Sequence, residues 1–456
     1  MSIPVNIQIK RYIWQDFSMQ RIIAMPAVIF TILYLTYLFK TPSKEVLDIL
    51  STSFLTLVFI WGGYNAAGSV VEEVKNNTWD NQRLSPTSPF ILGMGKLIGS
   101  TLYNWYGGII ILAIYTFYSL ITFDSSDNLI LSGFAATLYK VVMFVLCGFF
   151  CQAIAMLISV QALISEKQNG KAGSIAYLLL GLAASIPFQT YTSTNFNSDA
   201  TLLWFGSEIN ANLFMLCSLI TFLAWVLIAI YRSIGEELLF KNTPVAWAGF
   251  LVFIMLYVSG FTPSLPHKGY DFAGEIDWVI AILVAEIATY IMLFADKISI
   301  TRYRNLLYRI EQKNTRKICE NIPRWAASFS LMLVAIAVLT VHALDFPKFK
   351  VVFIFNISLV LFLIRDAAII HYFKFSGSKS AGIAAIFYFA VLYVLLPPIF
   401  CKLFGNDALT VFYPIANDDA GFTMLIPIML EISLIGHLLF KSCKKINLGI
   451  ESRKNT

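Results

Sequence analysis

The chain has 456 residues, of which 58% are hydrophobic and 13% are charged. Soluble domains are about half apolar and about a quarter charged, so a mean hydropathy of +0.71 excludes a water-soluble fold and indicates an integral membrane protein. The net charge of +6 is unevenly distributed between loops. We therefore interpret it as a signal of membrane topology and expect no nucleic-acid partner.

Residues 1–20 precede the first apolar run and combine Lys10 and Arg11 with the aromatic residues Tyr12, Trp14 and Phe17. This composition predicts an amphipathic segment that lies at the membrane interface. The apolar run that follows has the length of a membrane span, and no small-residue cleavage site closes it. We therefore expect it to remain as the first span.

Crossing a hydrocarbon core of about 30 Å requires roughly twenty helical residues. Apolar runs of suitable length occur at 21–39, 52–71, 91–120, 132–163, 172–189, 210–231, 245–262, 277–296, 325–344, 350–366, 382–401 and 422–440. They predict an all-α integral membrane protein with about twelve transmembrane helices. Membrane lipids are its expected surroundings.

The loops between these runs alternate in basic content, which indicates their sidedness. The basic set comprises Lys10 and Arg11, Lys75 and Arg83, Lys167 and Lys171, Arg232 and Lys241, the run from Lys297 to Arg324, Lys374 and Lys379, and the C-terminal tail. The acidic or polar set lies near 121–134, 190–209, 263–276 and 403–421. The alternation predicts cytoplasmic N and C termini.

The spacing of the spans also suggests six followed by six. The predicted first half is 21–240, and the second half is 241–456, with a cytoplasmic loop at 297–324 and a short C-terminal tail. In each half the most distinctive cytoplasmic loop follows the second span. No residue identity between these two loops supports a duplication, so the repeat is suggested by spacing alone.

The most specific stretch joins the second and third runs, at residues 72–89. The apolar spacing of Val70, Val71, Val74 and Thr78 predicts a short amphipathic helix along the membrane surface. Pro86 ends it, and Ser88 with Pro89 is a good cap and first-turn pair for the next helix. We therefore predict a rigid elbow between two spans.

In this stretch Glu72, Glu73, Thr78, Trp79, Leu84, Ser85, Pro86, Ser88 and Pro89 follow one another in an order that resembles the permeases of ABC-2-type transporters. The resemblance implies that the loop 72–89 docks on a separate cytoplasmic ABC ATPase, which binds ATP and magnesium. It implies the coupling residues Glu72, Glu73, Thr78, Trp79, Arg83, Leu84, Ser85 and Pro86. Family subunits often have six spans and pair as dimers, so a second permease chain is a possible partner. Abundant Ile, Asn and Lys suggest an AT-rich bacterial genome, so the expected location is the bacterial cytoplasmic (inner) membrane.

The chain offers no residue set for catalysis. The nearest approach to a phosphate-binding loop is Gly170–Lys171–Ala172, which lacks the earlier glycine and the hydroxyl. The four histidines are too scattered for a recognisable metal site. We expect a transport subunit that is not an enzyme and holds no cofactor or metal of its own.

Ionisable residues within apolar runs cost a few kcal/mol and are functional candidates. Lys140, Glu286 and Glu431 are the candidates for the substrate pathway. The side chain of Lys140 could also extend to the membrane surface, that is, snorkel. Either glutamate could pair with a cation, contact a polar substrate or stay protonated. We expect the pair Arg365–Asp366 to have a structural role at a cytoplasmic helix end.

Two other classes of function compete with an ATP-driven exporter. An ion-gradient-driven secondary transporter also has about twelve spans, and Glu286 or Glu431 could carry its proton. Such proteins place paired charges and broken helices near the membrane midplane, and the sequence suggests few of these. A membrane glycosyltransferase would need a carboxylate- and arginine-rich external loop, which is not evident. The substrate and the direction of transport are open.

Overall fold

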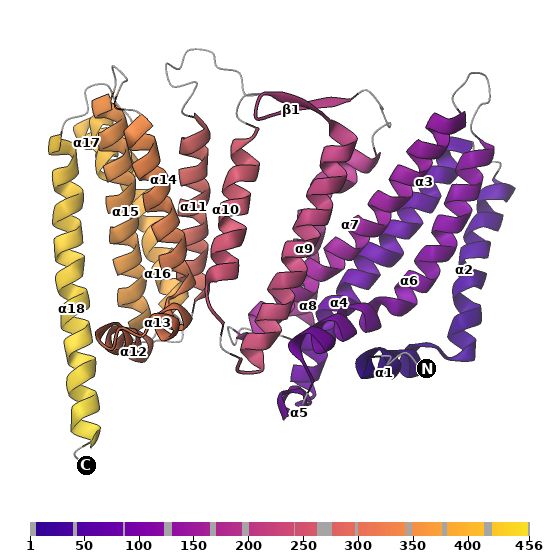
Figure 1. Cartoon of the computed structure of the whole chain (residues 1–456), viewed down its shortest axis with the longest axis horizontal. Helices are drawn as coiled ribbons and strands as arrows, with labels where there is room; N and C mark the ends of the chain where they lie inside the picture. The colour runs from indigo at the N-terminus through magenta and orange to yellow at the C-terminus, as the bar shows by residue number, and fades with distance from the viewer. Residues whose placement is uncertain are drawn as a thin grey trace. The chain divides into compact units, whose positions relative to one another are not determined.

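The computed structural model describes residues 6–39, 43–84, 87–122, 130–164, 170–193, 200–240, 242–261, 276–296, 300–342, 344, 349–375, 381–414 and 422–454. The chain forms two compact units (Figure 1). Unit 1 comprises 1–202 and 207–242, and unit 2 comprises 203–206 and 243–456.

Unit 1 is a bundle of long helices. Its elements are α1 (Ile7–Asp16), α2 (Met19–Leu38), α3 (Ser43–Phe54), the π-helix η1 (Leu55–Trp61), α4 (Gly62–Lys75), α5 (Trp79–Leu84), α6 (Pro89–Ile121), α7 (Ile130–Ile164), α8 (Gly170–Ser193) and α9 (Ala211–Glu237). The segments α3, η1 and α4 form one continuous span-length helix.

The π-helical turn η1 is stabilised by polar side chains from neighbouring helices. Gln152 donates a hydrogen bond to the carbonyl of Val58 (2.9 Å), and Asn104 donates one to the carbonyl of Leu57 (3.1 Å). A π-helical turn disturbs the regular hydrogen-bond ladder, and in lipid every backbone polar group needs a protein partner. These two amides explain why the distortion is tolerated inside the bundle.

Unit 2 is a second helical bundle. Its elements are α10 (Val245–Ser259), α11 (Ile276–Ala295), α12 (Ile300–Glu311), α13 (Thr315–Asn321), α14 (Arg324–His342), α15 (Phe349–Phe375), α16 (Ala381–Ala390), the π-helix η4 (Val391–Leu395), α17 (Leu396–Phe404), the 3₁₀ turns η5 (Asn406–Val411) and η6 (Phe422–Leu425), and α18 (Ile426–Lys454). Its main core joins α10, α11, α14 and α15 through side chains such as Leu251, Ile282, Met332 and Leu363.

Ten helices in the described part of the chain are long and apolar enough to cross a membrane. An eleventh candidate is α11 with α12, which are bent by 116° relative to each other, and α10 is a shorter apolar helix of 15 residues. The prediction of a mainly helical chain with many apolar helices of span length is thus confirmed. The count of twelve spans and the cytoplasmic termini remain predictions.

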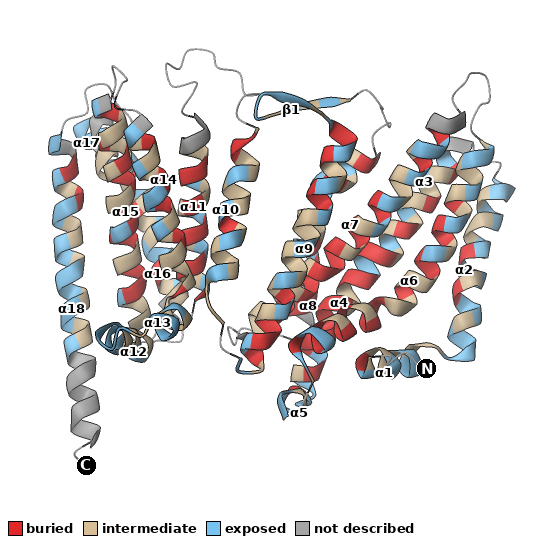
Figure 2. Cartoon of the chain, in the orientation of Figure 1, coloured by how far each residue is buried: buried red, intermediate tan, exposed pale blue. Residues whose placement is uncertain are grey.

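Exposed apolar side chains cover the helices at the edges of the bundles. Figure 2 shows α2 and the described part of α18 with exposed residues along much of their length. Phe30 and Tyr34 of α2 and Leu430 and Leu434 of α18 are all more than half exposed. Surfaces of this kind suit contact with lipid and would be unfavourable in water.

A two-stranded hairpin, β1 (Thr201–Trp204) and β2 (Ser207–Asn210), precedes α9. Its turn residues Phe205 and Gly206 have φ values of 48° and 71°. Positive φ at both central residues is the geometry of a tight type I′ turn. The sequence indicated only a polar loop here, so this small sheet was not predicted.

Candidate functional site

The predicted elbow, residues 72–89, is built differently from the sequence prediction. We expected a separate surface helix over Val70–Thr78, but α4 continues unbroken from the apolar interior to Lys75. It does so because Val70 and Val71 are buried within unit 1. Asn77 then adopts a positive φ of 54°, which asparagine tolerates, and the chain turns into the short helix α5.

The start of α6 agrees with the sequence prediction. The hydroxyl of Ser88 accepts a hydrogen bond from the backbone N–H of Ile91 (3.3 Å), and Pro89 occupies the first turn. This cap fixes the exit of the elbow. Ser85 and Pro86, which were predicted coupling residues, lie outside the described residues.

Glu73 joins the elbow to two other helices. Its side chain is 10% exposed and forms ion pairs with Arg11 of α1 (2.7 Å) and Lys96 of α6 (2.5 Å). Lys96 is fully buried and also donates to the backbone carbonyl of Ser69 (3.3 Å). Burial disfavours the charge of Arg11, but the hydrogen bond to Glu73 and the attraction of Tyr12 and Glu73 together outweigh burial and raise the pKa of Arg11. Glu73 is therefore committed to internal contacts.

A second buried carboxylate, Glu237 at the end of α9, fixes α5. It accepts hydrogen bonds from the indole of Trp79 (3.3 Å) and from the guanidinium of Arg83 (2.6 Å). The hydrogen bond to Glu237 raises the pKa of Arg83. Trp79 is buried, and the ammonium of Lys96 lies 5.3 Å from the centre of its ring. Trp79 thus contacts groups of both α6 and α9.

The N-terminal helix α1 packs on the first turns of α6. Gly99 allows this approach, since a Cβ atom there would lie 2.4 Å from Cδ2 of Tyr12. Asn6 donates to the carbonyl of Ile91 (2.6 Å), and Gln8 donates to Gln82 of α5 (3.0 Å). The predicted interfacial segment is therefore part of the elbow's support.

The outer side of the elbow is polar with one large apolar group. Glu72, Lys75 and Thr78 are exposed, and Leu84 is 85% exposed. Thr78 is held in place because its N–H donates to the carbonyl of Glu73 (2.8 Å). The predicted coupling residues thus divide into an outward set, Glu72, Thr78 and Leu84, and an inward set, Glu73 and Trp79. Arg83 is partly exposed.

Lys96 and Glu237 were not among the predicted site residues. Lys96 interrupts the apolar run of the third span, and Glu237 follows the apolar run of α9. A basic residue within a span is a functional candidate by itself. This signal was present in the sequence at Lys96, whereas a glutamate next to Glu236 at a helix end carries no comparable signal.

Unit 2 contains a buried group of charged and phenolic side chains, which we name the Arg365 cluster: Arg365, Asp366, Glu431, Tyr393 and Tyr290. Arg365 pairs with Asp366 (2.8 Å) and with Glu431 of α18 (2.7 Å). Asp366 also accepts hydrogen bonds from Tyr290 (2.8 Å) and Tyr393 (2.5 Å). The cluster therefore links α11, α15, η4 and α18.

Two predictions are decided by this cluster. We expected Arg365 and Asp366 at a helix end, but α15 continues to Phe375, and both side chains are almost fully buried. The expectation was wrong because the apolar run was judged to end at the first charged pair. Glu431, whose roles were left open, pairs with a cation from another helix.

Lys140 and Glu286 differ from Glu431. Both are half-buried, and within the described residues neither forms an ion pair. Lys140 is close enough to Asp48 for an electrostatic attraction. No group of three or more His, Cys, Asp or Glu residues suited to a metal ion occurs in the described part of the chain.

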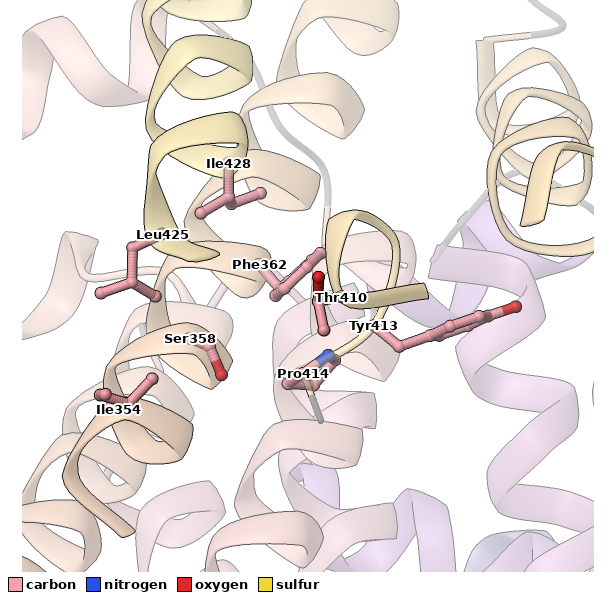
Figure 3. Close-up of a pocket in the computed structure, with 8 residues that line it drawn as sticks. All are labelled: Ile354, Ser358, Phe362, Thr410, Tyr413, Pro414, Leu425 and Ile428. Atoms are coloured by element: carbon pink, nitrogen blue, oxygen red, sulfur yellow. The ribbon is translucent and has the colours of Figure 1, made fainter. Parts of the chain in front are cut away.

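Unit 2 also contains a small pocket (Figure 3). Its volume of about 20 Å³ holds a single water molecule. It is lined by Ile354, Ser358, Phe362, Thr410, Tyr413, Pro414, Leu425 and Ile428. The guanidinium of Arg365 lies 4.7 Å from the centre of the Phe362 ring, and the hydroxyl of Tyr413 donates to the carbonyl of Tyr393. This pocket is too small for an organic substrate.

No protein-family model, no curated protein and no solved structure matches this chain.

Proposed function

We propose that the chain is the membrane-spanning permease subunit of an ATP-driven exporter of the ABC type, which couples to a separate cytoplasmic ATPase through the elbow. The proposal is supported chiefly by one observation: α5 presents an exposed face, and two buried carboxylates brace the elbow from behind. Glu237 holds α5, and Glu73 holds the end of α4. A docking element needs both properties, since it must contact a partner and transmit the partner's movement.

The bracing defines a mechanical path. Glu73 ties the elbow to α1 and α6, and Glu237 ties α5 to α9. Breaking a buried ion pair by removing one partner typically costs about 3–5 kcal/mol. A force on α5 therefore moves these helices together before the contacts yield, which suits switching by rigid-body motion.

In this proposal about twelve spans cross a bacterial cytoplasmic membrane with both termini inside. Arg302, Arg304 and Arg309 of α12 lie on the same cytoplasmic side and either dock on the ATPase or attract anionic headgroups. Either one chain supplies both halves of the pathway, or two copies associate. Lipid-linked, drug and polysaccharide substrates all suit an apolar pathway.

Purification from the native host in mild detergent tests the proposal. We expect an ATP-hydrolysing protein to co-purify with the chain, and we expect Leu84→Asp to abolish that association because it places a charge on the outer side of α5. Leu239→Asp is the matched control, since Leu239 is 88% exposed but lies outside the elbow. The absence of any ATPase, or equal loss in both variants, would contradict the proposal.

A second candidate, an ion-gradient-driven transporter, is favoured by a specific observation. The sequence suggested few paired charges or broken helices, whereas unit 2 has the Arg365 cluster and the π-helical segment η4 beside it. Ion-coupled transporters use such features. Transport in proteoliposomes that follows an imposed proton gradient without any ATPase would favour this function over the first.

A further inference from the structure

Among the residues that the structure describes, one carboxylate near the Arg365 cluster has no ion-pair partner. Asp366 accepts from Arg365, Tyr290 and Tyr393, so its oxygens are well occupied. Glu431 is bonded to Arg365. Asp366 is buried and the side chain of Glu431 is 33% exposed, and both carboxylates have partners that stabilise an ionised acid.

Glu286 lies next to this group without sharing its cation. It is one helical turn before Tyr290 on α11, so the two side chains lie on the same face. Tyr290 donates to Asp366, and Glu286 is close enough to Asp366 for the two carboxylates to repel each other. An ionised Glu286 would thus add a negative charge beside an existing one.

The helices packed on α11 supply no compensating charge near Glu286. α11 packs against α10, α14 and α15. The only ionisable side chain of α10 is Tyr257, and α14 has ionisable groups only at its ends, Arg324 and His342. Arg324 is paired with Asp296 at the end of α11.

Arg365 and Lys374 of α15 are likewise committed. Arg365 is saturated by Asp366, Glu431 and Tyr393. Lys374 donates to the carbonyls of Leu293 (2.7 Å) and Asp296 (2.9 Å) at the C-terminal end of α11, beyond Tyr290. Among the described residues, Arg365 is thus the one cation beside three carboxylates, and it pairs with Asp366 and Glu431 but not with Glu286. An excess of buried negative charge is unfavourable by several kcal/mol, so the site needs another positive charge.

We propose that Glu286 is a proton-binding site of unit 2, and that Tyr290 and Asp366 transmit its protonation state to the Arg365 cluster. Binding a proton removes the repulsion with Asp366, and losing it restores the repulsion. Tyr290, one turn after Glu286 on α11, donates its hydroxyl to Asp366 of α15 and so lies between the two helices. The interrupted helix η4, which carries Tyr393, is the element most able to respond, because π-helical turns are locally irregular and occur frequently at functional sites.

The inference deepens the second candidate function, since it selects Glu286 over Glu431 as the proton carrier. It does not require that an ion gradient drives transport, because a proton site also serves as a regulatory or structural switch in an ATP-driven protein. Its failure can therefore be told apart from failure of either candidate function.

Dicyclohexylcarbodiimide tests the proposal because it adds to protonated carboxylic acids in apolar surroundings and spares ionised ones. The full chain in lipid nanodiscs is treated between about pH 5 and about pH 9 and the labelled peptides are identified by mass spectrometry. We expect labelling of Glu286 at low pH that falls by about tenfold per pH unit once the site loses its proton. Asp366 and Glu431 should remain unlabelled.

Two further measurements keep the test decisive. Infrared spectra should contain a protonated-carboxyl band that is lost in Glu286→Gln and retained in Glu72→Gln, which removes an exposed carboxylate of unit 1. Arg365→Gln should expose Glu431 to labelling, because its partner is gone. The proposal is overturned if Glu286 is unlabelled and the infrared band is unchanged in Glu286→Gln. Protection of Glu286 by sodium at constant pH would also overturn it, since the site would then bind a metal cation.

Discussion

The buried contacts of the elbow predict that neutralising one of two adjacent glutamates, Glu73, lowers the free energy of unfolding far more than neutralising the other, Glu72. Glu73→Gln leaves the fully buried ammonium of Lys96 without its carboxylate, whereas Glu72→Gln changes an exposed side chain. The side chain of Arg11 is 37% exposed and can turn to water, so we assign the loss mainly to Lys96. We expect Glu73→Gln to lower the free energy of unfolding by about 3 kcal/mol, and Glu72→Gln to change it by less than about 0.5 kcal/mol.

Thermal unfolding in detergent, followed by tryptophan fluorescence, measures this difference. A loss of about 3 kcal/mol corresponds to a fall in Tm of roughly 6–12 °C for a unit of this size. Adding Lys96→Met to Glu73→Gln should recover most of the loss, because an apolar side chain of similar length replaces the unpaired charge. Equal effects of the two glutamate variants, or a further loss on adding Lys96→Met, would refute the reasoning.

Three other substitutions test contacts of the elbow and of the Arg365 cluster. Gly99→Leu should release α1 from α6, because even a Cβ atom at this position would lie 2.4 Å from Tyr12. The N-terminal segment should then become sensitive to protease. Unchanged proteolysis of this segment would contradict the packing of α1 on α6. Arg83→Gln removes the hydrogen bond to Glu237 and should reduce ATP-driven transport without preventing the ATPase from binding. If the variant no longer binds the ATPase, Arg83 belongs to the docking face. Arg365→Gln should destabilise unit 2 by about 3–5 kcal/mol in thermal unfolding, and a neutral effect would mean that its two carboxylates are not ionised.

The membrane architecture was largely accessible from sequence because hydropathy depends on composition over a whole span. Ten described helices fit that prediction by length and apolar character. The hairpin β1–β2 was missed because two strands of four residues are too short to produce a clear periodic pattern. The extent of α15 beyond Asp366 was missed because a buried ion pair interrupts the apolar run that a hydropathy reading follows.

The elbow was partly predictable. Its position, the cap at Ser88 and the break after α4 depend on local residue preferences, which a sequence displays. The opposite roles of Glu72 and Glu73 depend instead on which side of α4 meets α1 and α6, and that is a property of packing. The pairing of Glu237 with Arg83, 154 positions apart in the chain, has no local signal at all.

The central claim, that the elbow contacts an ATPase, is tested most directly by crosslinking in native membranes. A cysteine replaces Leu84 in a background where the exposed Cys217 and Cys319 are changed to serine. With a short thiol-to-amine crosslinker, the account predicts one adduct that contains a nucleotide-binding protein, and none from a cysteine at Phe39, which is 77% exposed at the C-terminal end of α2. Adducts without a nucleotide-binding protein, or the same adduct from both positions, would contradict it.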